Sequence, residues 1–124
     1  MFGSVIAVQQ YRVNRKRLKK DLFDKRYEIF EHTKEFLSDI VTGSVNDERK
    51  RKYLLGTRGA AFVFDETIKE YIDKIWSISV DLESWQGDAQ PSTHAEERNN
   101  HLKWINKQLS DVDSKFKKYM SLSH

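Results

Sequence analysis

The chain has 124 residues, of which 38% are hydrophobic, 12% aromatic and 33% charged. This length predicts a single domain with one hydrophobic core, and the apolar content excludes a disordered chain. The absence of cysteine excludes disulfides, thiolate metal sites and cysteine nucleophiles, and it fits a reducing, cytoplasmic compartment. With one proline and five glycines, little interrupts helix formation, so the composition favours an all-α fold.

The net charge of +3 is unevenly distributed along the chain. Residues 12–26 contain eight Lys or Arg against two Asp, whereas residues 27–124 contain fourteen Lys or Arg against seventeen acids. The excess positive charge therefore lies in one short run. Residues 1–8 before it are apolar and uncharged, but a membrane-spanning helix needs about 20 such residues, and a signal peptide would place its basic residues first.

The first predicted element is one long helix over residues 4–42. Its apolar residues recur at spacings of three, four and seven, the pattern of one helix face: Val8, Tyr11, Leu18, Leu22, Ile29, Phe36 and Ile40. From residue 22 onward this stripe widens, whereas before residue 22 it is one residue wide and is interrupted by Arg15. We expect Gly43 to end the helix, because glycine tolerates the left-handed conformation found there.

A second, short helix is predicted to follow Ser44 or Asn46 as its N-cap and to run through Leu55. Its acidic residues come first and its basic residues later, which suits the helix dipole. The glycine-containing stretch 56–59 ends it. Residues 60–64 are apolar, but no second strand is available to pair with them, so we expect an apolar turn that fills the core.

Two further long helices are predicted in the second half of the chain. Asp65 is placed to cap a helix over residues 66–86. After the polar loop 87–93, Thr93 and Glu96 have the spacing of a capping box for the last helix. The apolar residues of this helix follow a heptad pattern, typical of a helix packed between two others: Leu102, Ile105, Leu109, Val112, Phe116 and Tyr119.

These elements predict an all-α antiparallel bundle of three long helices plus one short helix, with an overhanging N-terminal helix. We divide the chain into a projecting basic segment (1–21), the helical bundle (22–120) and a frayed tail (121–124). Most of the excess charge lies in the projecting segment. The sequence therefore places its main candidate for function there, outside the bundle.

The basic residues of the projecting segment are the candidate contacts to a membrane or to phosphates: Arg12, Arg15, Lys16, Arg17, Lys19 and Lys20. Near an anionic membrane each such cation contributes about 1 kcal/mol, and the apolar leader would enter the interface. On nucleic acid the same charges would contact phosphates without reading sequence, but DNA-reading helices rarely begin with a hydrophobic leader. The third interpretation is a solvated helix face. The candidate residues for an interface with a protein partner, or for a homodimer, are Val8, Tyr11 and Leu18.

Two further features of the sequence need interpretation, the glycine-containing stretch 56–59 and Arg26. A GxxG loop such as 56–59 clamps nucleotide backbones in KH domains, but those domains need a three-stranded sheet that this sequence does not predict. We interpret the stretch as a helix-terminating turn, with Arg58 pairing with an acid of the body. Arg26 falls between Leu22 and Ile29 on the apolar seam, so we expect its stem to pack while its guanidinium reaches out or pairs with an acid on another helix.

No catalytic residue and no metal site is predicted. His94, Glu97 and His101 share one helix face, but their spacing is not that of zinc hydrolases, which favours a solvated surface. The Glu-rich stretch around His32 does not point into the core as the ligands of di-iron bundles do. No serine lies in a nucleophile elbow. We therefore expect no enzymatic activity and no cofactor. The tryptophans lie beside apolar helix faces, which favours packing at the edge of the core over an exposed anchor for a partner.

Residues 20–31 (KDLFDKRYxIFE) and 57–64 (TRGAxFxF) resemble a set of small uncharacterised bacterial proteins, over roughly residues 9–120. In those proteins a transmembrane helix leads through a basic helix into a helical cytoplasmic domain. The resemblance implies a helical domain at the inner face of the membrane and brings no catalytic residues. This chain has only the apolar stretch 1–8 where the transmembrane segment would lie.

The sequence as a whole favours a non-enzymatic, membrane-proximal helical adaptor or interaction protein of unknown partner. The alternative is a soluble inhibitor or antitoxin-like protein-binding bundle that dimerises through its first helix. A less favoured alternative is a non-specific nucleic-acid binder that uses the basic run.

Overall fold

The computed structural model describes residues 2–86 and 94–120, and for residues 2–16 it describes the backbone alone. Over these ranges the chain forms α-helices and the turns between them, with no β-strand. The helices are α1 (Phe2–Thr42), α2 (Asp47–Gly56), the single turn α3 (Ala60–Val63), α4 (Glu66–Gln86) and α5 (Ala95–Lys117). The predicted all-α fold is confirmed.

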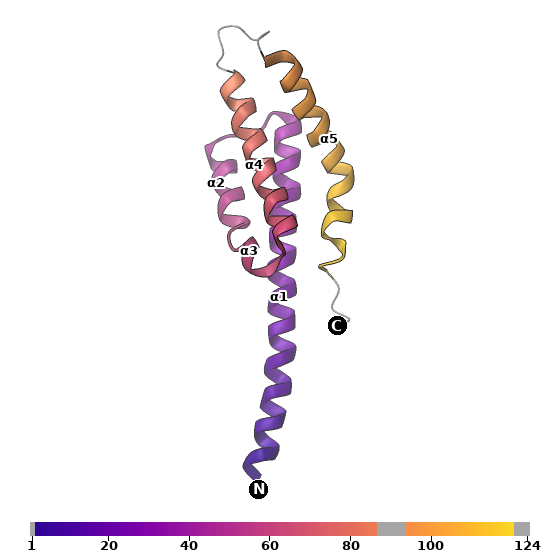
Figure 1. Ribbon diagram of the computed structural model, residues 1–124. Coiled ribbons are helices and arrows are strands. Elements are labelled where there is room, and N and C mark those ends of the chain that lie inside the picture. Colours follow the sequence, from indigo (N-terminus) through magenta and orange to yellow (C-terminus); the bar gives the residue numbers. More distant parts are fainter. Residues whose placement is uncertain (1, 87–93, 121–124) are drawn as a thin grey trace.

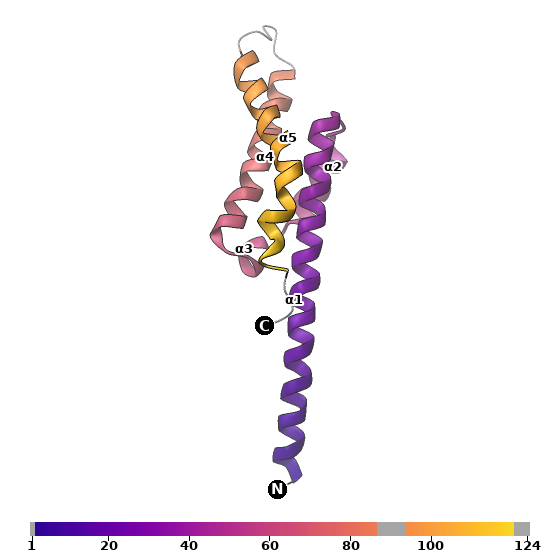
Figure 2. The same ribbon diagram turned by 90° about the vertical axis from the view of Figure 1, so that its right-hand side faces the viewer.

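Successive helices run in opposite directions, so that the chain goes up α1, down α2, up α4 and down α5 (Figure 1). α3 lies at the lower end of the bundle, between α2 and α4 (Figure 1). α1 is much longer than the bundle and continues far below it as a single helix, which both views show (Figures 1 and 2). The overhanging first helix is therefore a feature of the fold.

The core is built from aliphatic and aromatic side chains of every helix. Its buried members from the three long helices are Ile29, Phe36, Leu37, Ile40, Ile68, Tyr71, Ile72, Ile75, Ile78, Ile105, Val112 and Phe116. Tyr53 of α2 stacks on Phe36 with ring centroids 4.2 Å apart, and its hydroxyl donates to the Ile72 carbonyl at 2.8 Å. Trp76 and Trp104 are partly buried against this core, which confirms their predicted packing at its edge.

The predicted ends of the first two helices agree with the structure. Gly43 directly follows α1 and has a φ of 71°, the left-handed conformation for which glycine carries no side-chain penalty. Of the two candidate caps of α2, Asn46 has the role, because its side-chain oxygen accepts a hydrogen bond of 2.8 Å from the Arg49 N–H.

The later helix ends agree in part. Asp65 caps α4 as predicted, its carboxylate accepting a hydrogen bond of 3.2 Å from the Ile68 N–H. The predicted cap at Thr93 lies outside the described residues, and α5 begins at Ala95 with His94 in the N-cap position. The apolar segment 60–64 forms a single helical turn whose two end residues are buried in the core, whereas Ala61 and Phe62 are exposed, so the segment fills the core only in part.

Candidate interaction surface

The overhang begins where α1 loses contact with the bundle. Within the described part of α1, Ile29 is the most N-terminal buried side chain. Toward the N-terminus exposure rises, to 37% at Leu22 and 67% at Leu18. The apolar seam of the core therefore continues onto a part of the helix that no other helix covers in the described structure.

The candidate contact residues of the projecting segment include two groups. Arg17, Lys19 and Lys20 are exposed on the overhang, beside Leu18. Other candidates lie in the stretch whose backbone is helical and whose side chains are outside the described part: Val8, Tyr11, Arg12, Arg15 and Lys16. Because residues 17–20 are consecutive in a helix, their side chains point to different sides of it, so the overhang is cationic on more than one side and Leu18 lies exposed between Arg17 and Lys19 along the chain.

Arg26 fastens α1 to the lower end of the bundle. Its Nε donates to the Val63 carbonyl at 2.7 Å, and its Nη1 donates to the Tyr119 carbonyl at 3.0 Å. The guanidinium carbon also lies 5.7 Å from the ring centroid of Phe64. The prediction that the guanidinium reaches out or pairs with an acid on another helix is wrong, because it binds two backbone carbonyls. Val63 and Tyr119 lie where α3 and α5 end, and helix ends leave carbonyls that a fixed guanidinium fork can bind.

The two glycines of the stretch 56–59 each have a structural reason. A Cβ at position 56 would overlap the imidazole of His32, so that only glycine lets α2 pack this closely on α1. Gly59 has a φ of 87° and starts α3 from the left-handed region. Arg58 is exposed, and the described ion pairs do not include its predicted acidic partner. The geometry fits a helix-terminating turn and needs no bound phosphate to explain its glycines.

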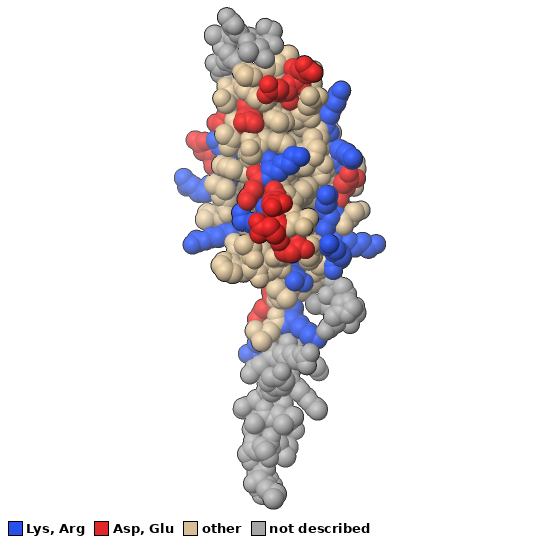
Figure 3. Space-filling model, viewed as in Figure 1, with Lys and Arg blue, Asp and Glu red and all other residues tan. Residues whose placement is uncertain are grey.

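Most cations of α2 are neutralised by the bundle. In the basic run 49–52, the first and last side chains both donate to Glu35 at 2.9 Å, and Lys50 donates to Glu83 at 2.6 Å. Arg51 is exposed and takes part in none of the ion pairs found among the described residues. On the face of the bundle seen in Figure 3, acidic and basic side chains likewise lie side by side.

Two carboxylates of α1 lie close to these cations, and their pKa values are changed in opposite directions. A hydrogen bond from Lys52, helped by the charge of Arg49, lowers the pKa of Glu35 below its ordinary value. Burial raises the pKa of Asp39, although Arg49 lies 3.7 Å away and acts against this change. The charged form of the half-buried Glu35 is therefore favoured, whereas burial disfavours the charged form of Asp39.

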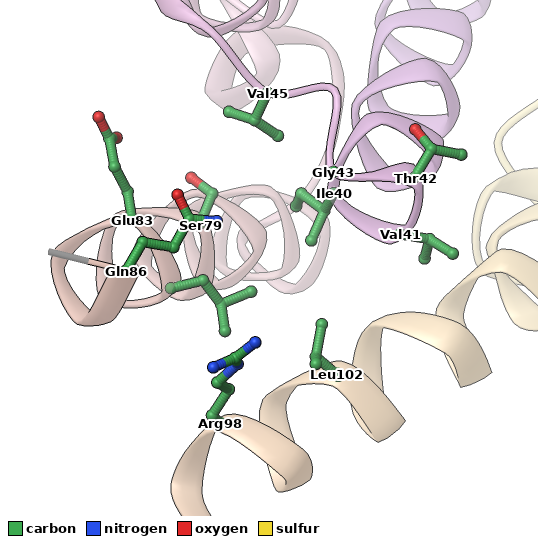
Figure 4. Close-up of a pocket in the computed structure, with 11 residues that line it drawn as sticks. Ile40, Val41, Thr42, Gly43, Val45, Ser79, Glu83, Gln86, Arg98 and Leu102 are labelled. Carbon is green, nitrogen blue, oxygen red and sulfur yellow. The ribbon is translucent and has the colours of Figure 1, made fainter. Parts of the chain in front are cut away.

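The upper end of the bundle contains a cavity of about 360 Å³ between α1, α4 and α5 (Figure 4). Its walls include Ile40, Leu82 and Leu102, and Arg98 reaches into it from α5 (Figure 4). Glu83 borders the same cavity but is paired with a lysine of α2. The hydroxyl of Ser79, which also lines the cavity, donates to the Trp76 carbonyl at 2.7 Å.

The histidines considered as metal ligands pack on an aromatic ring. His94 and His101 stack on Trp85 with ring centroids 4.9 and 5.3 Å apart, and His101 Nε2 lies 3.3 Å from a carboxylate oxygen of Asp81. Among the described residues, no group of three or more potential metal-ligating side chains is close enough to hold an ion. In this arrangement the two imidazoles join α4 to α5.

Comparison of the chain with protein-family models, curated proteins and solved structures found no match. None of the helices in the described ranges is both long enough and apolar enough to cross a membrane. The fold and surface define the class of protein on their own: an all-α bundle whose first helix carries exposed cations and an exposed apolar seam beyond the core.

Proposed function

We propose that this protein is a non-enzymatic helical adaptor held near an anionic membrane surface by the overhanging half of α1. The observation that carries this proposal is the exposure of Leu18 among Arg17, Lys19 and Lys20, on a helix that continues unbroken to Phe2. Cations near anionic lipid contribute about 1 kcal/mol each, and apolar side chains on the same helix gain by entering the headgroup region.

The length of the overhang gives it a long surface for contact with a membrane. At a rise of 1.5 Å per residue, the part of α1 from Phe2 to Leu22 is about 30 Å long. The described residues of the bundle beyond it mix both signs of charge, so the overhang is the most strongly cationic part of the chain. The bundle would then remain accessible to a protein partner.

A second candidate function follows from the same exposed seam. Leu18 and Leu22 continue the core stripe of α1, and such a stripe also suits a helix of a protein partner. A homodimer through two overhangs is less favourable, because it brings two basic segments together. An acidic helical partner avoids this repulsion. Light scattering that shows a dimer at low ionic strength would support the homodimer against this reasoning.

The proposal is tested by sedimenting the protein with vesicles of phosphatidylcholine alone or mixed with phosphatidylglycerol. We expect binding to the anionic vesicles only, and loss of that binding at high salt, because the attraction between exposed charges is screened. Equal binding to both kinds of vesicle, or binding to neither, would refute the membrane contact.

The matched variants reverse three charges in different places. The overhang variant is Arg15→Glu, Lys16→Glu and Arg17→Glu, and the control variant is Lys103→Glu, Lys107→Glu and Lys117→Glu on α5. Both change the net charge equally, but only the overhang variant should lose vesicle binding. The same pair in a DNA gel shift tests the nucleic-acid alternative, which predicts a loss of shift in the overhang variant at low salt.

A further inference from the structure

α2 has two faces of opposite character. Its inner face carries Tyr53 and Gly56, which are buried in the bundle. The opposite face carries Leu54 and Leu55, which are 49% and 58% exposed, and the exposed Arg51 lies one turn before them. A short helix that packs with one side therefore presents two leucines and an arginine on the other.

The next helix along the chain, α3, carries a further exposed apolar side chain, Phe62, which is 90% exposed. The exposure is imposed by the fold, since Ala60 and Phe64 are buried on either side and Arg26 holds the carbonyl of the neighbouring Val63. The short loop between α2 and α3 adds the exposed Arg58. We call this surface the α2–α3 corner; it consists of Arg51, Leu54, Leu55, Arg58 and Phe62.

The corner is the part of α2 and α3 where positive charge is not compensated. The neighbours of Arg51 in the run 49–52 all pair with acids of α1, α2 or α4. Arg51 and Arg58 take part in none of the ion pairs among the described residues. Two guanidinium groups without an acidic partner in the described part of the chain and three exposed apolar side chains therefore lie on two consecutive short helices and the loop between them, a combination that suits an anionic and partly apolar surface.

We propose that the α2–α3 corner is a second contact with anionic phospholipid, in which Phe62 and Leu55 enter the headgroup region and the two arginines bind lipid phosphates. This inference rests on the proposed function and specifies how the bundle meets the surface. α3 lies at the end of the bundle from which α1 overhangs (Figures 1 and 2). One membrane can therefore touch both when α1 lies at a shallow angle to it.

Size and shape favour lipid over a protein partner at this corner. A stable protein interface takes about 20 to 30 residues from each partner, and the corner offers five. Phe62 protrudes from a single helical turn instead of lining a groove, and a protruding aromatic ring suits a fluid interface that needs no shape complementarity.

The first test places an environment-sensitive fluorophore on a cysteine introduced by Phe62→Cys, which is specific because the chain has no other cysteine. The matched control is Asn106→Cys, at an exposed position of α5. With phosphatidylglycerol-containing vesicles at low salt, we expect a blue shift of the probe at position 62 and none at position 106. An unchanged probe at position 62 on protein that sediments with the vesicles overturns this inference and leaves the membrane contact of α1 intact.

The second test measures affinity for the same vesicles. Reversing both corner charges, Arg51→Glu with Arg58→Glu, should weaken binding by about tenfold or more. Lys103→Glu with Lys107→Glu changes the net charge equally and should weaken it far less. Equal weakening by the two pairs would show a general charge effect and would overturn the corner. Failure of the wild-type protein to bind any vesicle would instead refute the proposed function, and with it this inference.

Discussion

The close packing of His32 on Gly56 can be tested with the substitution Gly56→Ala. Its effect on the free energy of unfolding should change sign when the His32 ring is removed. A Cβ at position 56 would overlap Cγ and Cδ2 of the His32 ring and would lie 2.7 Å from Nδ1. These atoms are near the base of a side chain rooted in α1, so they cannot move aside without a change of rotamer or a shift of α2. We therefore expect Gly56→Ala to destabilise the bundle.

The magnitude follows from two opposing effects. Forcing extra atoms into a packed contact costs about 1 to 3 kcal/mol. Alanine in place of glycine stabilises a helix by about 0.5 to 1 kcal/mol, and Gly56 is the last residue of α2. These ranges leave a net loss between about 0 and 2.5 kcal/mol. A loss near the middle, about 1 kcal/mol, lowers the melting temperature by a few degrees in a domain of this size.

The test measures the free energy of unfolding in urea for four proteins: wild type, Gly56→Ala, His32→Ala and the double variant. In the His32→Ala background the obstructing ring is absent, so Gly56→Ala should become stabilising by up to about 1 kcal/mol. Gly43→Ala is the control, because its φ of 71° is costly for alanine while nothing lies within 4 Å of its Cβ position. It should be destabilising in both backgrounds. An equal loss from Gly56→Ala in both backgrounds would refute the steric explanation.

Three further substitutions test the contacts that hold the bundle. Arg26→Met should lower the free energy of unfolding by about 2 to 4 kcal/mol, because two charge-assisted hydrogen bonds to carbonyls are lost while most of the stem remains; an unchanged urea midpoint would contradict this. Tyr53→Phe removes one buried hydrogen bond and should cost about 1 kcal/mol in the same assay, with the m-value unchanged. Glu35 has a lowered pKa in the fold, so it contributes stability above its ordinary 4.5 and loses it as the pH falls through the folded value. The stability advantage of wild type over Glu35→Gln should therefore be present at neutral pH and vanish in strong acid; an advantage independent of pH would exclude this linkage.

Local patterns predicted the helices well because their causes are local. The period of the apolar residues reports the face that a helix buries, and Asn46, Asp65 and Gly43 act on backbone groups within four residues of themselves. For the same reason the resulting fold class could be predicted without knowledge of any long-range contact.

The partners of individual side chains could not be predicted in this way. Arg26 was expected to reach solvent or an acid, and it binds carbonyls 37 and 93 residues further along the chain. The exposure of Phe62 could not be predicted either, because it lies in an apolar run whose two end residues, Ala60 and Phe64, are buried. A single turn of α3 points these side chains in different directions, and the direction depends on how α3 is held between α1 and α4.

The sequence by itself determined the helical segments, most of their ends and the uneven distribution of charge, because these depend on residue type and spacing along one chain. Only the tertiary structure decided which cations are neutralised, why Gly56 must be glycine, and which apolar side chains remain exposed on α1, α2 and α3. Those properties depend on distances between segments far apart in the chain, and such distances exist only once the helices have packed.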